Sequence, residues 1–105
     1  MTGASGALTH EVKAGVHYIS LSGVLAMDSV GTMYRSLKPL ERGAKLMLDA
    51  SGVTKADSSA LALITTLLRG AHAQDMRVVL QPLPTALSPI IELYGLHDML
   101  AAHAA

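Results

Sequence analysis

The segment Leu48–Arg69 has the sequence LDASGVTKADSSALALITTLLR and decides the fold of this chain. Its first residues end an apolar run, Lys45–Ala50, that is typical of a buried strand. The polar stretch Ser51–Ala56 predicts a loop. A periodic apolar pattern then predicts a long helix over Ser58–Ala73, opened by the triplet Asp57-Ser58-Ser59. This strand–loop–helix unit is the building block of an α/β domain.

Two short strands are expected before this unit. His10–Lys13 and Val16–Ser22 are rich in β-formers, and Ala14–Gly15 between them is typical of a tight turn. Gly23 is expected to end the second strand. The two strands therefore predict an antiparallel hairpin.

Helices and strands alternate in the rest of the chain. A helix is expected from Asp28 or Ser29 to Pro39, and Arg77–Gln81 (RVVLQ) predicts another strand. A last helix over Leu87–Leu96 is expected after a cap at Thr85 or Ser88, with a final turn within His97–Ala102. Alternating strands and helices favour parallel pairing through right-handed crossovers. We expect a single α/β domain over residues 1–105 with a flexible terminus at 1–7, a mixed sheet of four to five strands, and helices mainly on one face.

The helix Ser58–Ala73 has two different faces when its residues are placed at 100° intervals. One arc is apolar and is expected to face the sheet, with Leu63 at its edge: Ala60, Leu61, Ile64, Leu67, Leu68 and Ala71. The opposite arc has only one charged residue: Ala62, Thr65, Thr66, Arg69 and Ala73. Small, nearly neutral side chains let another surface approach closely and cost little to desolvate. We interpret this outer arc as a docking surface; the alternative is a small-residue helix that is merely exposed.

The triplet Asp57-Ser58-Ser59 allows two interpretations. Asp and Ser at a helix start cap the free amides of the first turn. A hydroxyl at this position also lies in the positive field of the helix dipole, which suits a phosphoserine or the docking of a partner. Ser59 and Ser58 are therefore candidate phosphorylation sites, and the triplet is a candidate partner contact.

Composition excludes several classes of function. The chain has 105 residues, 50% of them hydrophobic, 15% charged and 3% aromatic, and eight basic residues balance eight acidic ones. A neutral chain has no electrostatic footprint for nucleic acid or for an anionic membrane surface.

Cysteine is absent, and the five histidines lack metal-ligand spacing, so we expect no metal site. No phosphate-binding glycine motif occurs, so we expect no nucleotide or other cofactor. No signal peptide or membrane-inserted segment is expected either. The low charged fraction indicates that part of the surface is covered by something else.

The segment from Val16 to Leu100 resembles the STAS domain, the fold of bacterial anti-sigma factor antagonists and of the cytoplasmic tails of sulfate transporters. The residues that carry the resemblance are the D-x-S-x-V-x-x-x-D-S-S motif from Asp49 to Ser59 and the L-Y-x-L ending at Leu93–Leu96. Within this family, the L-A-L-I-x-x-L-L helix and the ELYGL ending are most similar to the MlaB group. Members of that group are small subunits of a phospholipid-transporting ABC system that maintains outer-membrane lipid asymmetry.

The resemblance implies a non-catalytic cytoplasmic subunit, located at the inner membrane through a complex of an MlaF-like ATPase subunit and a permease. It implies that the ATPase contact lies at Asp57, Ser58 and Ser59, where the MlaB group typically carries Thr at the position of Ser58. Together with the outer arc, the candidate partner-binding residues are Asp57, Ser58, Ser59, Ala62, Thr65, Thr66 and Arg69.

Two alternatives remain open at this level. In anti-sigma factor antagonists the residue phosphorylated by the partner kinase matches Ser59, so the chain also fits a phosphorylation switch. Ala60 stands where both groups usually carry Gly, so the triplet by itself does not separate them. An enzyme that uses Ser59 as a nucleophile is the third hypothesis, and no G-x-S-x-G motif supports it.

Overall fold

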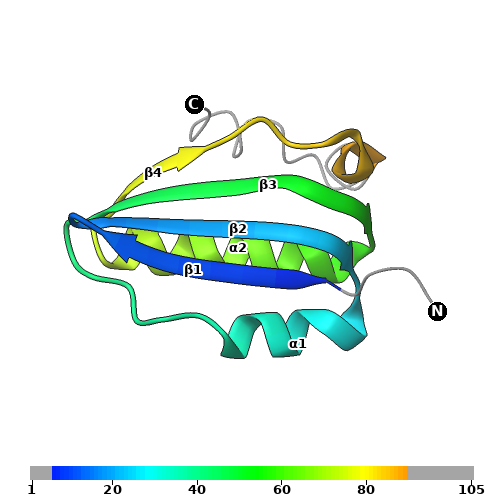
Figure 1. The fold of residues 1–105 in the computed structure, drawn as a ribbon, viewed down its shortest axis with the longest axis horizontal. Helices are drawn as coiled ribbons and strands as arrows, with labels where there is room; N and C mark the ends of the chain where they lie inside the picture. Colours follow the sequence, from blue (N-terminus) through cyan, green and yellow to red (C-terminus); the bar gives the residue numbers. More distant parts are fainter. Residues whose placement is uncertain (1–5, 90–105) are drawn as a thin grey trace.

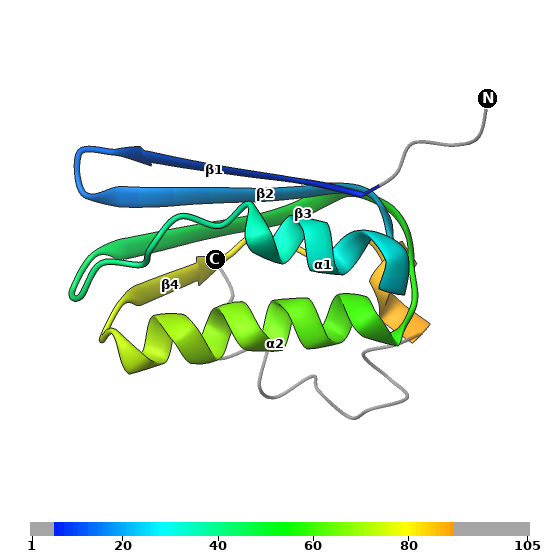
Figure 2. The same ribbon diagram turned by 90° about the horizontal axis from the view of Figure 1, so that it is seen from below.

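A four-stranded mixed sheet with two α-helices packed on one of its faces forms the framework (Figure 1, Figure 2). The structure is a computed structural model, and it describes residues 6–89. Its elements are β1 Ala7–Lys13, β2 Val16–Leu25, α1 Met27–Arg35, β3 Lys45–Ala56, α2 Ser58–Ala73, β4 Arg77–Leu80 and the 3₁₀ turn η1 Thr85–Leu87. The predicted fold class is confirmed, including the location of the helices on one face.

The strands lie side by side in chain order. β1 and β2 form the predicted antiparallel hairpin around the Ala14–Gly15 turn, and β2, β3 and β4 pair in parallel. Parallel neighbours need a crossover, and α1 and α2 are those crossovers. Figure 2 shows both helices below the sheet, so the other face of the described sheet carries no helix.

β2 and β3 are both longer than predicted, and the predicted loop Ser51–Ala56 is wrong because these residues continue β3. The register shifts twice: Ser20 pairs with Asp49 but Ser22 pairs with Gly52, and a second shift follows Gly23. Each shift inserts one extra residue into β3, so the alternation of buried and exposed residues breaks after Ala50. A period-2 pattern cannot detect a strand that changes phase. Gly23 likewise lies within β2, in a left-handed conformation (φ 76°), and does not end the strand.

The two ends of α1 also differ from the prediction. The N-cap is Ala26, whose amide donates to the Ser29 hydroxyl at 3.1 Å, so Ser29 acts from inside the first turn and Asp28 does not cap. The helix ends at Arg35, four residues before Pro39, because the Ser36 and Leu37 amides already close the last turn. α2 runs over Ser58–Ala73 as predicted.

Some predictions concern the ends of the chain. Ala7 is the first residue of β1, so the predicted flexible terminus is wrong at that position; residues 1–5 lie outside the described range. Ser88 and Pro89 begin helical structure after η1, whose N-cap is Pro84. The rest of the predicted helix, the turn within His97–Ala102 and the L-Y-x-L ending also lie outside the described residues.

The core lies between the sheet and the helices and is built from aliphatic side chains, without Phe or Trp. Six α2 residues are buried: Ala60, Leu63, Ile64, Leu67, Leu68 and Ala71. Leu61 was predicted in this set but is only half-buried, whereas Leu63 is 2% exposed. The reason is α1, which packs beside α2 on the side of Leu63 and so rotates the buried face toward it.

Candidate functional site: the outer face of the two helices

The start of α2 is organised by Asp57, the residue at the end of β3. Its extended backbone makes it the N-cap, and its carboxylate accepts the Ser59 amide at 2.8 Å. The Ser59 hydroxyl donates to the same carboxylate oxygen. Ser59 is half-buried, while Ser58 is exposed and has no hydrogen bond to another described residue. The two serines are therefore not equivalent: Ser59 completes the cap and Ser58 faces outward.

The charge of Asp57 is stabilised by these donors. The hydroxyl of Ser59 and then its amide lower the pKa of the carboxyl below its ordinary value, with smaller contributions from the Met27 and Ala60 amides. Met27 is the first residue of α1 and Ser58 the first of α2, so the starts of both helices lie close to one carboxylate (Figure 2). Asp57 stays ionised at neutral pH, and its negative charge interacts favourably with the positive ends of both helix dipoles.

The predicted outer arc forms one open hollow of about 340 Å³. Its lining residues are Ser58, Leu61, Ala62, Thr65, Thr66 and Arg69. Five of the seven predicted site residues thus come together, and Asp57 and Ser59 lie beside the hollow without lining it. Thr65 is half-buried, whereas Ala62, Thr66 and Arg69 are exposed.

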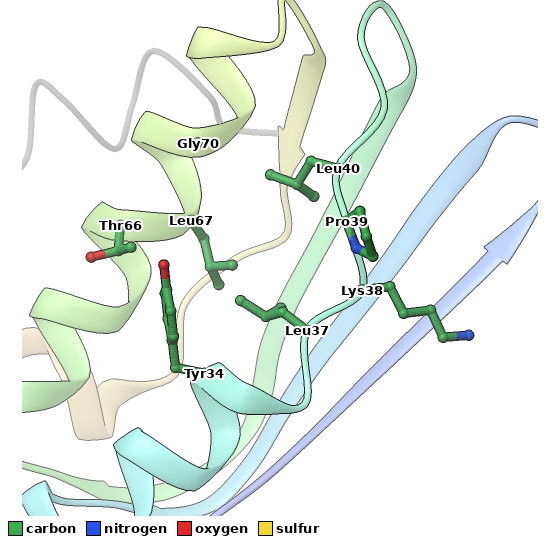
Figure 3. A pocket seen from close by; sticks show the side chains of 8 residues that line it. All are labelled: Tyr34, Leu37, Lys38, Pro39, Leu40, Thr66, Leu67 and Gly70. Atoms are coloured by element: carbon green, nitrogen blue, oxygen red, sulfur yellow. The ribbon is translucent and has the colours of Figure 1, made fainter.

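The sequence did not predict the contribution of α1. Tyr34 of α1 is 52% exposed, and its ring stands between α1 and Thr66 of α2 (Figure 3). A second hollow of about 340 Å³ lies beside it, where Leu37 and Leu40 of the connection between α1 and β3 meet Leu67 of α2 (Figure 3). A third, of about 320 Å³, continues along α1 past Gly31. The one sequence signal for Tyr34 is that aromatic residues are rare here: the chain has three tyrosines and no Phe or Trp. That scarcity could have marked Tyr34 as a candidate contact residue.

The three hollows join into one surface, because Thr66 lines all of them and Tyr34 lines two. We call it the α1–α2 face and define it by these residues: Val30, Gly31, Tyr34, Arg35, Leu37, Leu40, Ser58, Leu61, Ala62, Thr65, Thr66 and Arg69. Arg35 and Arg69 are its charged side chains, and Lys38, which borders it, points away from the helices (Figure 3). The lining contains no carboxylate. The face is thus mostly small or apolar, with positive charge where it is charged at all.

Neither a metal centre nor a membrane span is found in the part of the chain that the structure describes. Residues 6–89 contain no cluster of three or more His, Asp or Glu side chains arranged to hold a metal ion. Among the same residues, no helix has the length and apolar character needed to cross a bilayer.

The arrangement matches a known fold. Over 90% of this chain and 82% of the other, it superimposes on the crystal structure of an anti-sigma factor antagonist from Mycobacterium paratuberculosis with a TM-score of 0.57 and 22% sequence identity. A search of curated protein sequences gave no significant match. The two chains therefore share a fold.

The family is shown by sequence as well. The model of the family described as "Mlab, STAS domain" matches residues 6–101, nearly the whole chain. The chain belongs to this family.

Proposed function

We propose that this protein is a non-catalytic, MlaB-like subunit of a phospholipid-transporting ABC system, which binds the ATPase subunit through the α1–α2 face and supports its assembly and activity. In this proposal the protein is cytoplasmic and reaches the inner membrane through the complex of ATPase and permease. The family membership supports the system, and the α1–α2 face supports the mode of action. The observation that carries the proposal is the continuity of this face across two helices with almost no charge to desolvate.

The chemistry of the face indicates what the ATPase would present. Small residues such as Ala62 and Gly31 leave the helix backbone accessible, so a partner helix can approach closely. Tyr34 offers a large, half-exposed ring of the kind that anchors interfaces. Since Arg35 and Arg69 have no carboxylate among the lining residues, the partner is expected to supply Asp or Glu opposite them.

Co-purification with the ATPase tests the proposal. Arg69→Glu reverses the charge in the α2 hollow, and Thr66→Trp places a bulky ring where all three hollows meet; each is expected to abolish stoichiometric co-purification. Arg77→Glu is the matched control for charge, because Arg77 is also exposed and its register partner Lys45 lies on the sheet face opposite α1 and α2. Thr32→Trp is the control for bulk, on α1 but outside the hollows. If Arg69→Glu and Thr66→Trp fold and still co-purify, the face is wrongly assigned.

The second candidate is an anti-sigma factor antagonist switched by phosphorylation, favoured by the helix-start serines and compatible with the structural match. The contacts at this helix start distinguish the two serines. A phosphate on Ser59 would replace the hydrogen bond to Asp57 and face that carboxylate, whereas the exposed Ser58 hydroxyl can accept a phosphate without losing such a bond. Mass spectrometry after incubation with the cognate kinase, with Ser58→Ala and Ser59→Ala variants, tests this candidate. Absence of phosphate on both serines excludes it, and phosphate on Ser59 must destabilise the cap.

A further inference from the structure

Two buried histidines lie far from the start of α2 and take no part in the proposed partner contact. His10 of β1 and His17 of β2 are 7% and 0% exposed, and they are the buried polar side chains among residues 6–89. Both lie on the helix-covered face of the sheet, with ring centroids 5.1 Å apart. Burying two imidazoles is unfavourable unless their polar atoms are paired.

A directed set of hydrogen bonds fixes the tautomers of both rings. The Lys38 backbone amide donates to His10 Nδ1 at 2.9 Å, so this nitrogen carries no proton and Nε2 does. His10 Nε2 lies 2.8 Å from His17 Nδ1, which must then accept. The remaining proton of His17 is on Nε2, which has no hydrogen bond to a described residue and lies 3.7 Å from the Glu41 carboxylate. The Lys38 amide and the His10 Nε2–H each face an acceptor only when both histidines are neutral.

An added proton cannot fit this arrangement. On His17 Nδ1 it would face the N–H of His10, and on His10 Nδ1 it would face the N–H of Lys38. Moving the His10 proton from Nε2 to Nδ1 relieves the first conflict and creates the second. One hydrogen bond is therefore lost whichever nitrogen accepts the proton.

The charges around the pair come from the connection between α1 and β3. Lys38 carries a positive charge near His10, and the exposed Glu41 is the acidic group near His17. Other charged groups on the neighbouring elements are exposed or paired with one another. Glu11 and Lys13 pair with each other on β1, Arg42 pairs with Asp75, and Arg35, Lys45, Arg69, His72 and Arg77 are exposed. Burial, and then His17 and Lys38, hold the pKa of His10 below its ordinary value.

The pair holds one particular segment. Within residues 6–89, the bond from the Lys38 amide to His10 is the hydrogen bond that joins residues 38–41 to the sheet. The next attachments are at Arg42, whose guanidinium pairs with Asp75, and at Gly43, whose amide donates to the Gln74 carbonyl at 2.8 Å. Leu37 and Leu40, on either side, form a wall of the hollow beside Tyr34 (Figure 3). We propose that His10 and His17 form a pH-sensitive latch that fastens this connection to the sheet, and that one added proton opens it.

The sign of the effect follows from the neutral folded state. Because the unfolded chain protonates His10 below its ordinary pKa of 6.5 and the latched state disfavours that proton, the latch is stable above that pH and opens as the pH falls below it. The rest of the sheet keeps its hydrogen bonds, so the opening is local.

Nuclear magnetic resonance of the unmodified protein tests the latch directly. At pH 7.5, nitrogen-detected imidazole spectra are expected to show the Nε2–H tautomer for both His10 and His17; an Nδ1–H tautomer in either ring overturns the proposal. Between pH 7.5 and 5.5, the hydrogen-exchange protection of the Lys38 amide is expected to fall at least about tenfold, while that of Leu48 in β3 stays constant. Unchanged protection of Lys38, or parallel loss at Leu48, also overturns it.

A variant removes the titration while keeping polar groups in place. The double variant His10→Gln with His17→Asn cannot be protonated and is expected to give Lys38 protection that is independent of pH over the same range. His72→Gln is the control, because His72 is exposed on α2 and its loss should leave the pH response intact. If the double variant retains the pH response, the pair is not the latch. If it does not fold, the tautomer measurement on the unmodified protein still decides the question.

Discussion

At the scale of single residues, Asp57 connects the sheet to both helices. It directly follows the last residue of β3, caps α2, accepts the Ser59 hydroxyl and lies close to the first amide of α1. The motif that carried the family resemblance is thus also a structural joint between the sheet and two helices. A residue with this double role is difficult to interpret by mutation, because loss of binding and loss of the cap coincide.

Substitution of Asp57 separates its charge from its hydrogen bonds. Asp57→Ala removes the cap and is expected to lower the melting temperature by roughly 4–8 °C, whereas Asp57→Asn keeps an acceptor and should lower it less. Since its pKa is lowered in the folded state, the carboxylate contributes stability above the ordinary aspartate range, and this contribution is lost as the pH falls through the folded pKa. The gap between the unmodified protein and Asp57→Asn should therefore close below about pH 4.

Thermal melts of the unmodified protein and both variants, recorded from pH 7 to pH 3, measure this. Asp28→Asn is the control, because Asp28 is in the first turn of α1 but caps nothing. A gap that is constant across the whole pH range contradicts the assigned role of the charge.

At the scale of elements, the pairing of β2 with β3 is the feature that shapes the site. β3 continues through two register shifts and ends at Ala56, six residues beyond the predicted end. The next residue is Asp57, at the start of α2. The backbones approach closely at the first shift: a Cβ atom on Gly52 would lie 2.9 Å from the Ser22 Cβ and 3.3 Å from the Leu21 carbonyl oxygen. Position 52 therefore has no room for a side chain.

Gly52→Ala tests this close approach. It is expected to cost about 1–3 kcal/mol in the free energy of unfolding, because the neighbouring backbone must shift. Gly31→Ala is the contrasting substitution within α1, where the nearest atom would be the Arg35 guanidinium at 3.8 Å; it should stabilise by roughly 0.5–1 kcal/mol through helix propensity. Urea unfolding measures both. Equal effects of the two substitutions would contradict the register described for β2 and β3.

At the scale of the whole molecule, the packing of α1 against α2 decides which residues are core and which are surface. Leu63 is buried because α1 covers it, and Leu61 lies open to the hollow with Ser58 and Thr65. The same packing exposes Tyr34 beside Thr66. The core and the α1–α2 face are therefore two results of one helix–helix contact.

Alanine substitution of the two leucines tests this division. Leu63→Ala is expected to destabilise the fold by roughly 2–5 kcal/mol, and Leu61→Ala by less than half as much. Leu61→Ala is instead expected to weaken co-purification with the proposed ATPase partner, which Leu63→Ala should affect only through stability. Equal destabilisation by both substitutions would contradict this division. It would mean that Leu61 belongs to the buried face of α2, as the sequence periodicity predicts.

The sequence by itself determined the element order, the hairpin, the bounds of α2 and most of its buried residues, because local periodicity and turn chemistry are properties of neighbouring residues. It also pointed to Ser58, Ala62, Thr65, Thr66 and Arg69 as one surface, since a regular helix fixes which of its residues share a side. Only the tertiary structure decided the phase change in β3, the exposure of Tyr34 and the His10–His17 pair. Each depends on a contact between segments that are distant in sequence, and no local pattern records such a contact.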